Sequence, residues 1–375
     1  MKKVLYAASG AGHLEHFHRP YLARLAEEGW EVWTFCNGKA EFPGVHRALD
    51  YPLKKRLWSP VNFRTALRLS RLLKQEKFDL VYVHTSLAAF FVRLALRLAG
   101  KGNARVVSMV HGYLFDDKTF LPRRLLLLGA EKLTASVTDT VLTMNACDYE
   151  IASRYRLAAQ VLPVDGIGVE FDRFTFPGRE EARKALKVPE DRFVLLYPAE
   201  FSGRKNQAFL IRTLAQLPPE VMLVLAGQGS ELDACRKLAE RCGVADRVLM
   251  PGYVQDLSLW YAAADVCVSA SRIEGLPFNV MEAMYSGRPV VATRIKGHTD
   301  LITDGAEGLL YEFNDDFGFC DCIGMLRKDA ELRRIMGEKG QRRAERYALE
   351  RVLPQVMAGL DEKPEEAYIQ EDAMV

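Results

Sequence analysis

The sequence predicts an α/β protein made of two similar parallel sheets, one after the other. Short apolar runs alternate with amphipathic segments along the 375 residues, and this rhythm is typical of parallel strands joined by crossover helices. The strand series stops near residue 143 and begins again at residue 193, after a stretch rich in Pro and Gly. We therefore expect two doubly wound domains.

The apolar runs are interpreted as buried strands, because near-continuous apolarity suits a parallel sheet that helices cover on both faces. In the first series they span 3–8, 31–35, 80–83, 105–110 and 140–143. In the second series they span 193–197, 222–226, 247–250, 266–269 and 289–292. A periodic stretch from about residue 329 to residue 360 is helical.

These patterns divide the chain. We expect an N-terminal domain over 1–164, an interdomain connection over 165–190 and a C-terminal domain over 191–345. A closing helix follows over 346–361 and can pack back on the N-terminal domain. The acidic residues 362–375 are too polar to pack, so we expect them to be disordered.

The composition is that of a soluble globular protein, with 49% hydrophobic and 27% charged residues. The longest apolar stretch, 87–99, contains Arg93 and Arg97 and is too short to span a membrane, and the start of the chain lacks the apolar run of a signal peptide. The seven cysteines are scattered without C-x-x-C spacing, which indicates neither a disulfide framework nor a zinc site. We expect a cytoplasmic protein.

Charge is unevenly distributed along the chain. Residues 1–178 hold 25 basic and 17 acidic side chains, and the remainder holds 26 and 32. Residues 54–77 alone carry eight Lys or Arg against Glu76, together with apolar residues such as Trp58. This composition suits attachment to the inner face of the membrane. A solvated helix face whose apolar side lies in the core is an equally good interpretation.

Candidate binding residues follow the strands, because doubly wound proteins bind ligands beyond the carboxyl ends of their strands. Gly10, Gly12 and His13 follow the first strand, and the glycines predict either close approach of a ligand or a plain tight turn. In the second domain, Glu274 and Gly275 form a loop before a helix in which Pro277 suits the first position.

The start of this helix is a candidate phosphate site. The N–H groups of Leu276, Phe278 and Asn279 lie at the helix N-terminus, and the usual capping residues are absent. Glu282 lies further along the same helix, where its carboxylate can bind both hydroxyls of a ribose. An ordinary strand, loop and helix with solvated acids remains the alternative.

At this point the sequence resembles a known family. Glu274 and Glu282, with seven residues between them, and the following Gly287-Arg-Pro-Val-Val291 are similar to the signature of retaining family 4 glycosyltransferases. That family has two Rossmann-like domains in the GT-B arrangement. The stretch from Gly12 to Tyr21 and the Val110-His111-Gly112 motif resemble its bacterial capsule and exopolysaccharide subgroup.

The resemblance implies roles for particular residues. Glu274 would bind the hydroxyls of the donor sugar, Glu282 the ribose, and the backbone from Gly275 through Leu276 to Pro277 and Phe278 the sugar and diphosphate. Lys205 would neutralise the diphosphate, and Tyr253 and Val254 would hold the base. His111 would contact the sugar at the reaction centre. The family typically has Gly-Arg-Leu after the first strand of its second domain, where this chain has Ala199-Glu200-Phe201. That arginine is absent, so Arg204 is the candidate for a second cation beside Lys205.

A metal site is not expected. His13, Glu15, His16 and His18 are close in sequence, but they lie at a helix start where their side chains should spread over several faces. The family resemblance also implies transfer without a metal, so we expect no cofactor beyond the UDP-sugar donor. No basic, aromatic-rich groove indicates a nucleic-acid partner.

The sequence therefore predicts a retaining, metal-independent glycosyltransferase, peripheral to the inner membrane. It would move a sugar from a UDP-sugar to a polyprenyl-diphosphate-linked saccharide in cell-surface polysaccharide biosynthesis. Two alternatives stay open: an enzyme like the UDP-sugar 2-epimerases, and a catalytically inactive protein that binds sugar nucleotides.

Overall fold

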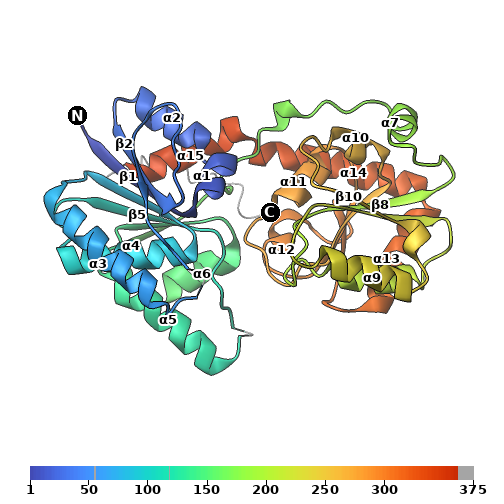
Figure 1. Ribbon diagram of the computed structural model, residues 1–375. Coiled ribbons are helices and arrows are strands. Elements are labelled where there is room, and N and C mark those ends of the chain that lie inside the picture. Colours follow the sequence, from blue (N-terminus) through green and yellow to red (C-terminus); the bar gives the residue numbers. More distant parts are fainter. Residues whose placement is uncertain (55, 118, 362–375) are drawn as a thin grey trace. The chain divides into compact units, whose positions relative to one another are not determined.

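The chain forms two compact units (Figure 1). The computed structural model describes residues 1–54, 56–117 and 119–361, so the acidic segment 362–375 lies outside the described residues. The first unit comprises the described residues of Met1–Gly168 and those from Glu350 to Asp361, and the second comprises Val169–Leu349. Each unit contains one parallel sheet covered by helices, as the α/β prediction requires.

The first unit contains a seven-stranded parallel sheet in the order β3-β2-β1-β4-β5-β6-β7. Its strands are β1 (Lys3–Gly10), β2 (Glu31–Asn37), β3 (Val45–Asp50), β4 (Leu80–His84), β5 (Arg105–Val110), β6 (Thr140–Thr143) and β7 (Gln160–Pro163). Its helices are α1 (Ala11–Phe17), α2 (Arg19–Glu27), α3 (Pro60–Gln75), α4 (Ser86–Ala99), α5 (Leu121–Ala135), α6 (Ala146–Arg154) and α15 (Leu349–Leu360). Two of these strands, β3 and β7, were not predicted.

The second unit contains a six-stranded parallel sheet in the order β10-β9-β8-β11-β12-β13. Its strands are β8 (Phe193–Pro198), β9 (Val221–Ala226), β10 (Val248–Gly252), β11 (Val266–Ser269), β12 (Val290–Thr293) and β13 (Gly308–Tyr311), of which β13 was not predicted. Its helices are α7 (Arg179–Leu186), α8 (Gln207–Leu214), α9 (Leu232–Arg241), α10 (Ser258–Ala263), α11 (Phe278–Tyr285), α12 (His298–Leu301), α13 (Asp316–Lys328) and α14 (Ala330–Ala344).

Each sheet has its own apolar core. Leu5, Val81 and Val83 of the first sheet are fully buried, and Leu196 and Leu225 of the second are equally inaccessible. Burying a side chain of this size contributes about 1.5–3 kcal/mol, so the central strands fix each unit firmly. The loops that follow these strands are therefore held on rigid supports.

The structure places residues 165–190 differently from the expected connection. The second unit begins at Val169 and already includes a 3₁₀ turn (Phe171–Arg173) and α7. Arg183 of α7 is fully buried and its guanidinium lies 2.7 Å from the Asp265 carboxylate, so most of this segment packs in the second unit.

The helical prediction over 329–360 is interrupted. Helix α14 ends at Ala344, a 3₁₀ turn (Glu345–Tyr347) follows, and Ala348 is extended before α15 begins. The described residues from Glu350 to Asp361 belong to the first unit. Arg105 Nε donates to the Leu360 carbonyl oxygen at 2.9 Å, which ties the end of α15 to β5.

Candidate active site

The strand order of the second sheet brings two distant loops together. The chain proceeds from β8 outward to β10 and then returns to place β11 on the other side of β8. Ligands of doubly wound sheets bind at such a switch point, outside the carboxyl ends of the strands. Lys205 follows β8 and Glu274 follows β11, so both lie at this position.

Glu274 is the centre of a buried charge cluster. Its Oε1 accepts from Lys205 Nζ at 2.6 Å and from Ser271 Oγ at 2.7 Å, and its Oε2 accepts from Arg204 at 2.7 Å. The side chain of Glu274 is only 7% exposed, that of Lys205 is 11% exposed and that of Arg204 is 44% exposed. Two cations for one carboxylate leave the cluster with a net positive charge.

The environment keeps Glu274 ionised. Burial by itself would raise the pKa of Glu274, but the nearby Lys205 ammonium and Arg204 guanidinium lower it to about 2. Burial lowers the pKa of Lys205, and the Glu274 carboxylate opposes that change. The 2.6 Å contact is a charge-assisted hydrogen bond, so both groups are charged at neutral pH.

Buried hydroxyl groups support the ion pair of Lys205 and Glu274. Tyr197 Oη, at the end of β8, lies 2.9 Å from Ser271 Oγ and also donates to the Lys205 carbonyl oxygen at 3.2 Å. Ser269 Oγ lies 3.1 Å from the imidazole of His298. None of these positions was singled out in the sequence, because isolated Ser, Tyr and His residues carry no recognisable spacing.

The loop from Gly275 to Phe278 leads into α11. Pro277 is the N-cap residue and not the first helical residue, which corrects the predicted position by one. No side chain caps this helix start, as the sequence indicated. Gly297 approaches so closely that a Cβ there would lie 2.5 Å from the Gly275 carbonyl oxygen, so the loop rests against the start of α12.

Glu282 lies on α11 with both oxygens already engaged. Arg173 donates to Oε1 at 2.5 Å and Tyr261 Oη donates to Oε2 at 2.9 Å. Burial raises the pKa of Glu282 despite the attraction of Arg173. The Arg173 side chain is 52% exposed and can move aside, and each carboxylate oxygen has a second lone pair for a ribose hydroxyl.

Tyr253 and Val254 follow β10 at the same edge of the sheet. Tyr253 is 62% exposed, and the preceding Gly252 has a φ of 84°, a left-handed conformation that favours glycine. The Gly252 carbonyl oxygen accepts from the Gly227 N–H at 2.7 Å, which fixes this loop beside the end of β9.

In the first sheet the switch point lies between β1 and β4. Strand β1 runs through Gly10, and α1 begins directly at Ala11 without an intervening loop. Gly10 has a φ of −156°, which any residue adopts, so its backbone conformation does not by itself require glycine. A Cβ on Gly10 or Gly12 would meet nothing closer than 3.9 Å, and close approach of a ligand stays a prediction.

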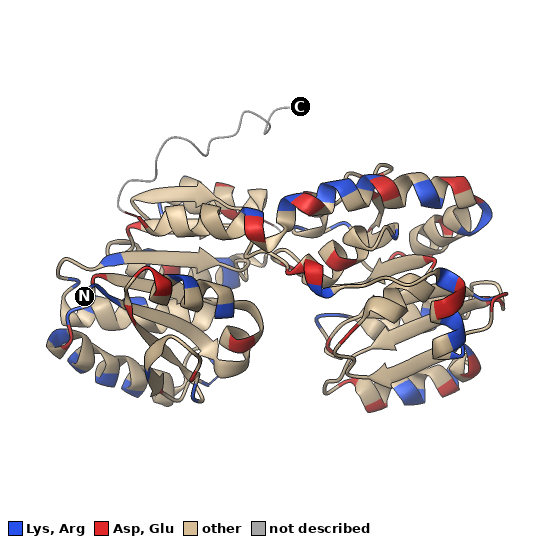
Figure 2. Ribbon diagram, turned by 90° about the horizontal axis from the view of Figure 1, so that it is seen from above, with Lys and Arg blue, Asp and Glu red and all other residues tan. Residues whose placement is uncertain are grey.

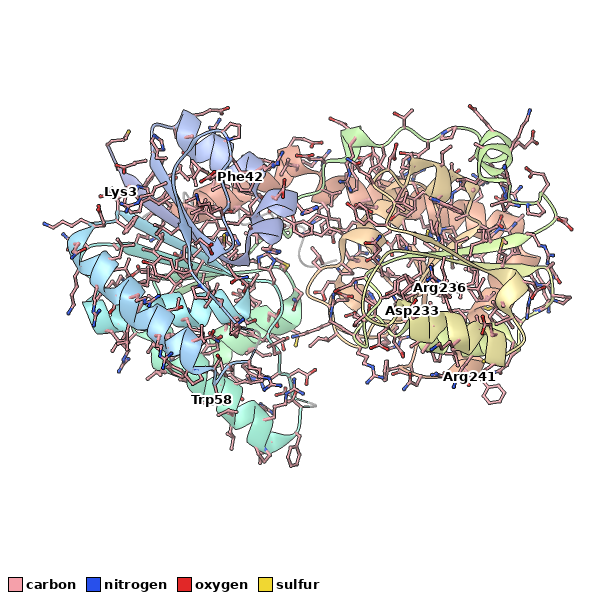
Figure 3. The ribbon with its side chains drawn as sticks, in the orientation of Figure 1. Lys3, Phe42, Trp58, Asp233, Arg236 and Arg241 are labelled. Atoms are coloured by element: carbon pink, nitrogen blue, oxygen red, sulfur yellow. The ribbon has the colours of Figure 1, made fainter. Side chains whose placement is uncertain are left out.

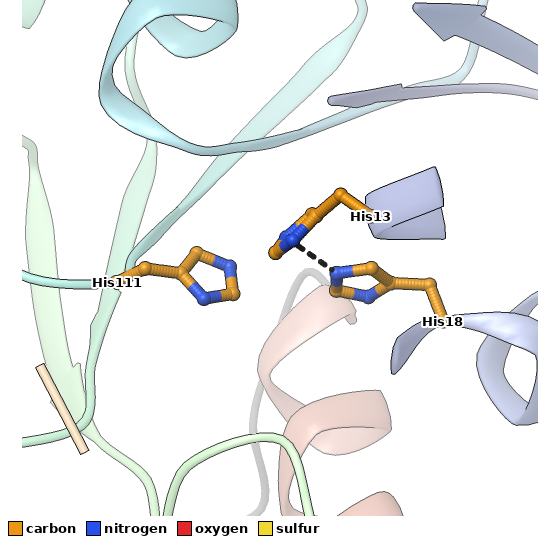
Figure 4. A group of neighbouring side chains, drawn as sticks. All are labelled: His13, His18 and His111. Atoms are coloured by element: carbon orange, nitrogen blue, oxygen red, sulfur yellow. Dashed lines mark hydrogen bonds between the residues drawn. The ribbon is translucent and has the colours of Figure 1, made fainter. Parts of the chain in front are cut away.

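His111, after β5, belongs to a cluster of four imidazoles with His13, His18 and His84, and Figure 4 shows all of them except His84. His111 Nε2 lies 3.2 Å from His84 Nδ1, and His13 Nε2 lies 3.1 Å from His18 Nε2. Burial lowers the pKa of His13 to about 4 and that of His111 to about 3, so these rings are neutral at pH 7.

Four residues near the start of α1, namely His13, Glu15, His16 and His18, were expected to point in different directions. Only Glu15 and His16 do so. Glu15 forms an ion pair with Arg19, and a ring nitrogen of His16 lies 2.6 Å from the Gly12 carbonyl oxygen. His13 and His18 instead converge with His111, and the three offer ring nitrogens within 4.8 Å of one another. The sequence argument missed this group because His111 is distant in the chain.

Comparison with known proteins agrees with this geometry. The family described as "Glycosyltransferase Family 4" matches residues 21–163, and "Glycosyl transferases group 1" matches residues 178–343. EpsD of Bacillus subtilis (strain 168), whose name describes it as a glycosyltransferase, is 32% identical over 362 residues, which is 95% of each chain.

Two further proteins are similar. UDP-Gal:alpha-D-GlcNAc-diphosphoundecaprenol alpha-1,3-galactosyltransferase of Escherichia coli is 26% identical over 282 residues, or 72% of each chain. The structure of HepE of Anabaena in complex with UDP-glucose has a TM-score of 0.74 at 20% identity, covering 95% of this chain and 98% of that one.

Two Rossmann-like units, with a cation and carboxylate cluster at the switch point of the second, define a glycosyltransferase of the GT-B class. The match to EpsD over nearly the whole length then places the chain in a particular family. It belongs to glycosyltransferase family 4.

Proposed function

We propose that this glycosyltransferase moves a sugar from a UDP-sugar to a polyprenyl-diphosphate-linked saccharide, with retained configuration and without a metal, in cell-surface polysaccharide biosynthesis. The cluster of Lys205, Arg204 and Glu274 carries the proposal. The name of the Escherichia coli relative, which specifies UDP-galactose and a diphosphoundecaprenol acceptor, supports the donor and acceptor classes.

Two cations in this cluster suit a departing diphosphate. Lys205 is buried and held by Glu274, so its position is set before the donor binds. Arg204 is nearly half exposed and can turn from Glu274 toward phosphate oxygens. Fixed positive charge at the place where negative charge develops lowers the barrier to bond cleavage without a metal. Arg204 thus takes the part of the absent family arginine, whose position within Ala199-Glu200-Phe201 is occupied by Glu200.

Glu274 is suited to hold the sugar and not to take a proton. A carboxylate with a pKa of about 2 is a weak base at neutral pH. Its oxygens can still accept hydrogen bonds from sugar hydroxyls. We propose that a diphosphate oxygen of the leaving UDP accepts the proton of the incoming hydroxyl on the same face of the sugar. Retention then needs no side-chain nucleophile.

Calorimetry with UDP-glucose, UDP-galactose, their N-acetylated forms and GDP-mannose tests the donor class. We expect a UDP-sugar to bind and Arg204→Met to weaken that binding at least tenfold, because one of two phosphate contacts is lost. Arg236→Met, on the exposed face of α9, is the matched control and should change nothing. Equal affinity of wild type and Arg204→Met for every UDP-sugar would contradict the proposed diphosphate site.

Assays of sugar transfer, UDP binding and epimerisation on the same protein distinguish the alternative functions. Glu274→Gln should reduce sugar transfer at least a hundredfold while UDP binds no more weakly, because the substitution removes an anion from a cationic pocket. Transfer at the wild-type rate would show that Glu274 does not serve the reaction. Formation of an epimer from UDP-N-acetylglucosamine without an acceptor would favour the epimerase interpretation.

The proposed membrane attachment rests on two helices of the first unit. In α5 only Thr134 is buried, whereas Leu121, Leu125, Leu126 and Leu133 are 44–60% exposed and the preceding Phe120 is 77% exposed. This apolar surface was not noticed in the sequence. Large exposed apolar patches mark protein or membrane contact sites. No helix among the described residues is long and apolar enough to cross a membrane.

Helix α3 supplies the adjacent positive charge. Ala66 and Leu69 pack in the core, while Arg64, Arg68 and Arg71 are exposed, so the helix by itself fits the interpretation of a solvated face. Helix α4 contacts both α3 and α5, and the three helices lie on one side of the sheet (Figure 1). Trp58, just before α3, is 63% exposed (Figure 3). Arginines beside exposed leucines suit an anionic lipid surface.

Flotation with vesicles containing anionic phospholipid tests this surface. We expect Arg64→Glu/Arg68→Glu/Arg71→Glu, and separately Leu121→Ser/Leu125→Ser/Leu126→Ser, to lose most of the bound fraction. The control Arg236→Glu/Lys237→Glu/Arg241→Glu makes the same charge change on α9 of the second unit, whose helices carry acidic and basic residues interleaved (Figures 2 and 3). If both first-unit variants bound the vesicles as the wild type does, this surface would not be the membrane-binding site.

A further inference from the structure

We propose that His13, His18 and His111 form a binding site for a borderline transition-metal ion such as Zn²⁺, and that its occupation inhibits the enzyme. The three side chains offer ring nitrogens within 4.8 Å of one another (Figure 4). The Nε2 atoms of His13 and His18 are 3.1 Å apart. Two nitrogens bound tetrahedrally to one zinc ion are about 3.3 Å apart, because each Zn–N bond is ~2.0–2.1 Å. This pair therefore already has nearly the spacing of a chelate.

The positions of the three imidazoles are set by the ends of the first sheet. His13 lies in α1, directly after β1, His18 lies between α1 and α2, and His111 follows β5. The rings of His13 and His111 are 5.1 Å apart between centroids, so a small rotation of the His111 side chain brings its nitrogen within reach of a shared ion. A site supported on strand ends is preorganised in this way.

Tyr6 orients the buried member of the group. His18 Nδ1 lies 2.9 Å from Tyr6 Oη, and both residues are fully buried. When Nδ1–H donates to the tyrosine oxygen, the lone pair of Nε2 faces His13. Metal-binding histidines commonly donate their second ring N–H to such a partner, which fixes the tautomer.

The ligand set selects the class of ion. Three neutral imidazoles without a carboxylate suit zinc, copper or nickel and not magnesium or calcium. Three protein ligands also leave a fourth position for water or substrate, as in catalytic zinc sites. His84 is a neighbour of the group, since its Nδ1 lies 3.2 Å from His111 Nε2. Its own Nε2 is buried and has no hydrogen-bond partner among the described residues. Metal binding through His111 Nε2 would replace that contact.

Inhibition, which rests on the proposed function, follows from the place of His111. His13 and His111 follow β1 and β5 at the carboxyl edge of the first sheet, where doubly wound domains bind substrates, and an imidazole bound to a metal cannot also contact a substrate hydroxyl through the same nitrogen. The ion would thus act as a regulator of a reaction that itself needs no metal.

Titration of the full chain with Co²⁺ gives a direct readout of binding, because its visible d–d bands are weak in water and become intense in a protein site of low coordination number. We expect one equivalent per chain with intense visible d–d bands and no thiolate charge-transfer band. His13→Gln should weaken binding at least tenfold, and His111→Gln should do the same. His16→Gln is the matched control, because His16 lies on the same helix but is exposed, and it should bind as wild type.

Absence of binding, a thiolate band, or equal affinity of His13→Gln and His16→Gln would overturn the site. Circular dichroism of both variants shows whether either is misfolded, and His111→Gln then provides the second test. Zn²⁺ should inhibit transfer by the wild type and by His16→Gln alike. Stoichiometric Co²⁺ binding without inhibition by Zn²⁺ would overturn the regulatory part. Because the Co²⁺ spectrum needs no transfer activity, failure of the proposed function would leave the binding result readable.

Discussion

Glu274 and Glu282 are two buried carboxylates on one loop and helix, and their neighbours give them opposite pKa shifts. Two cations outweigh burial at Glu274 and lower its pKa, whereas at Glu282 burial outweighs Arg173 and raises the pKa. Opposed shifts of this kind indicate different tasks for two acids in one site. Glu274 is therefore a fixed anion among cations, and Glu282 has the character of a hydrogen-bonding group, which suits the proposed ribose contact.

His298 gives the second unit a dependence on pH. Burial lowers its pKa from 6.5 to about 4, since the ring lies fully buried between Ser269 and Thr293. The unfolded chain then binds this proton more readily than the folded chain. We expect the free energy of unfolding to fall as the pH drops from about 6.5 toward 4, by up to about 1.4 kcal/mol per pH unit from this group.

Urea unfolding of wild type and His298→Gln at pH 7, 6 and 5 measures this contribution. The variant is expected to be less stable at pH 7, because its polar contacts are altered, but to lose less stability on acidification. His16→Gln is the exposed control. Parallel pH dependences of His298→Gln and wild type would contradict a depressed pKa at His298.

At the scale of elements, the close contact of α14 with the end of α11 positions the helix that carries Glu282. A Cβ on Gly337 of α14 would lie 2.1 Å from the Gly287 carbonyl oxygen, so this approach requires glycine. We expect Gly337→Ala to destabilise the second unit by roughly 1–3 kcal/mol, because the backbone must move. Thermal unfolding measures the change.

Gly324 of α13 is the matched control for that substitution. Nothing lies within 4 Å of a Cβ built there, so Gly324→Ala should be neutral or stabilise by about 0.5–1 kcal/mol through helix propensity. Equal unfolding temperatures for the two variants would show that α14 can shift without cost.

The strands that the sequence did not predict share a physical cause. β3 and β13 are edge strands of their sheets, and so is β7. β3 has exposed polar residues such as His46 and Arg47, β7 is only partly buried, and β13 begins with Gly308 and has three apolar residues. Short or half-exposed strands lack the long apolar run that marks a central strand. Their pairing comes from the neighbouring strand and not from their own composition.

At the scale of the whole molecule, the two units have separate cores, and the proposed donor residues from Lys205 to Glu282 all lie in the second. A ligand that binds only the folded second unit should stabilise that unit alone. Trp260 is the one tryptophan of four between Val169 and Leu349, so it reports on this unit.

We expect UDP to raise the unfolding temperature recorded by Trp260 fluorescence in the Trp30→Phe/Trp33→Phe/Trp58→Phe variant. The transition of the first unit, recorded in the Trp260→Phe variant, should move less. If UDP shifted only the transition of the first unit, the donor site would have been assigned to the wrong half of the chain.

The sequence alone determined the α/β class, the two domains, ten of the thirteen described strands, and, through the motif around Glu274, the family resemblance. These features are local: apolar periodicity and a short motif can be recognised without knowing the fold. For the same reason the sequence located Lys205, Arg204 and Glu274 singly, each after a strand.

Only the tertiary structure decided which residues meet. The order of strands places β8 beside β11 and thereby joins Lys205 to Glu274, 69 residues apart. The tertiary structure also brings Arg173 to Glu282, and His111 to His13 and His18. It leaves the leucines of α5 exposed. Such contacts depend on the packing of a whole sheet, because side chains distant in the chain become neighbours only when every intervening strand and helix has found its place.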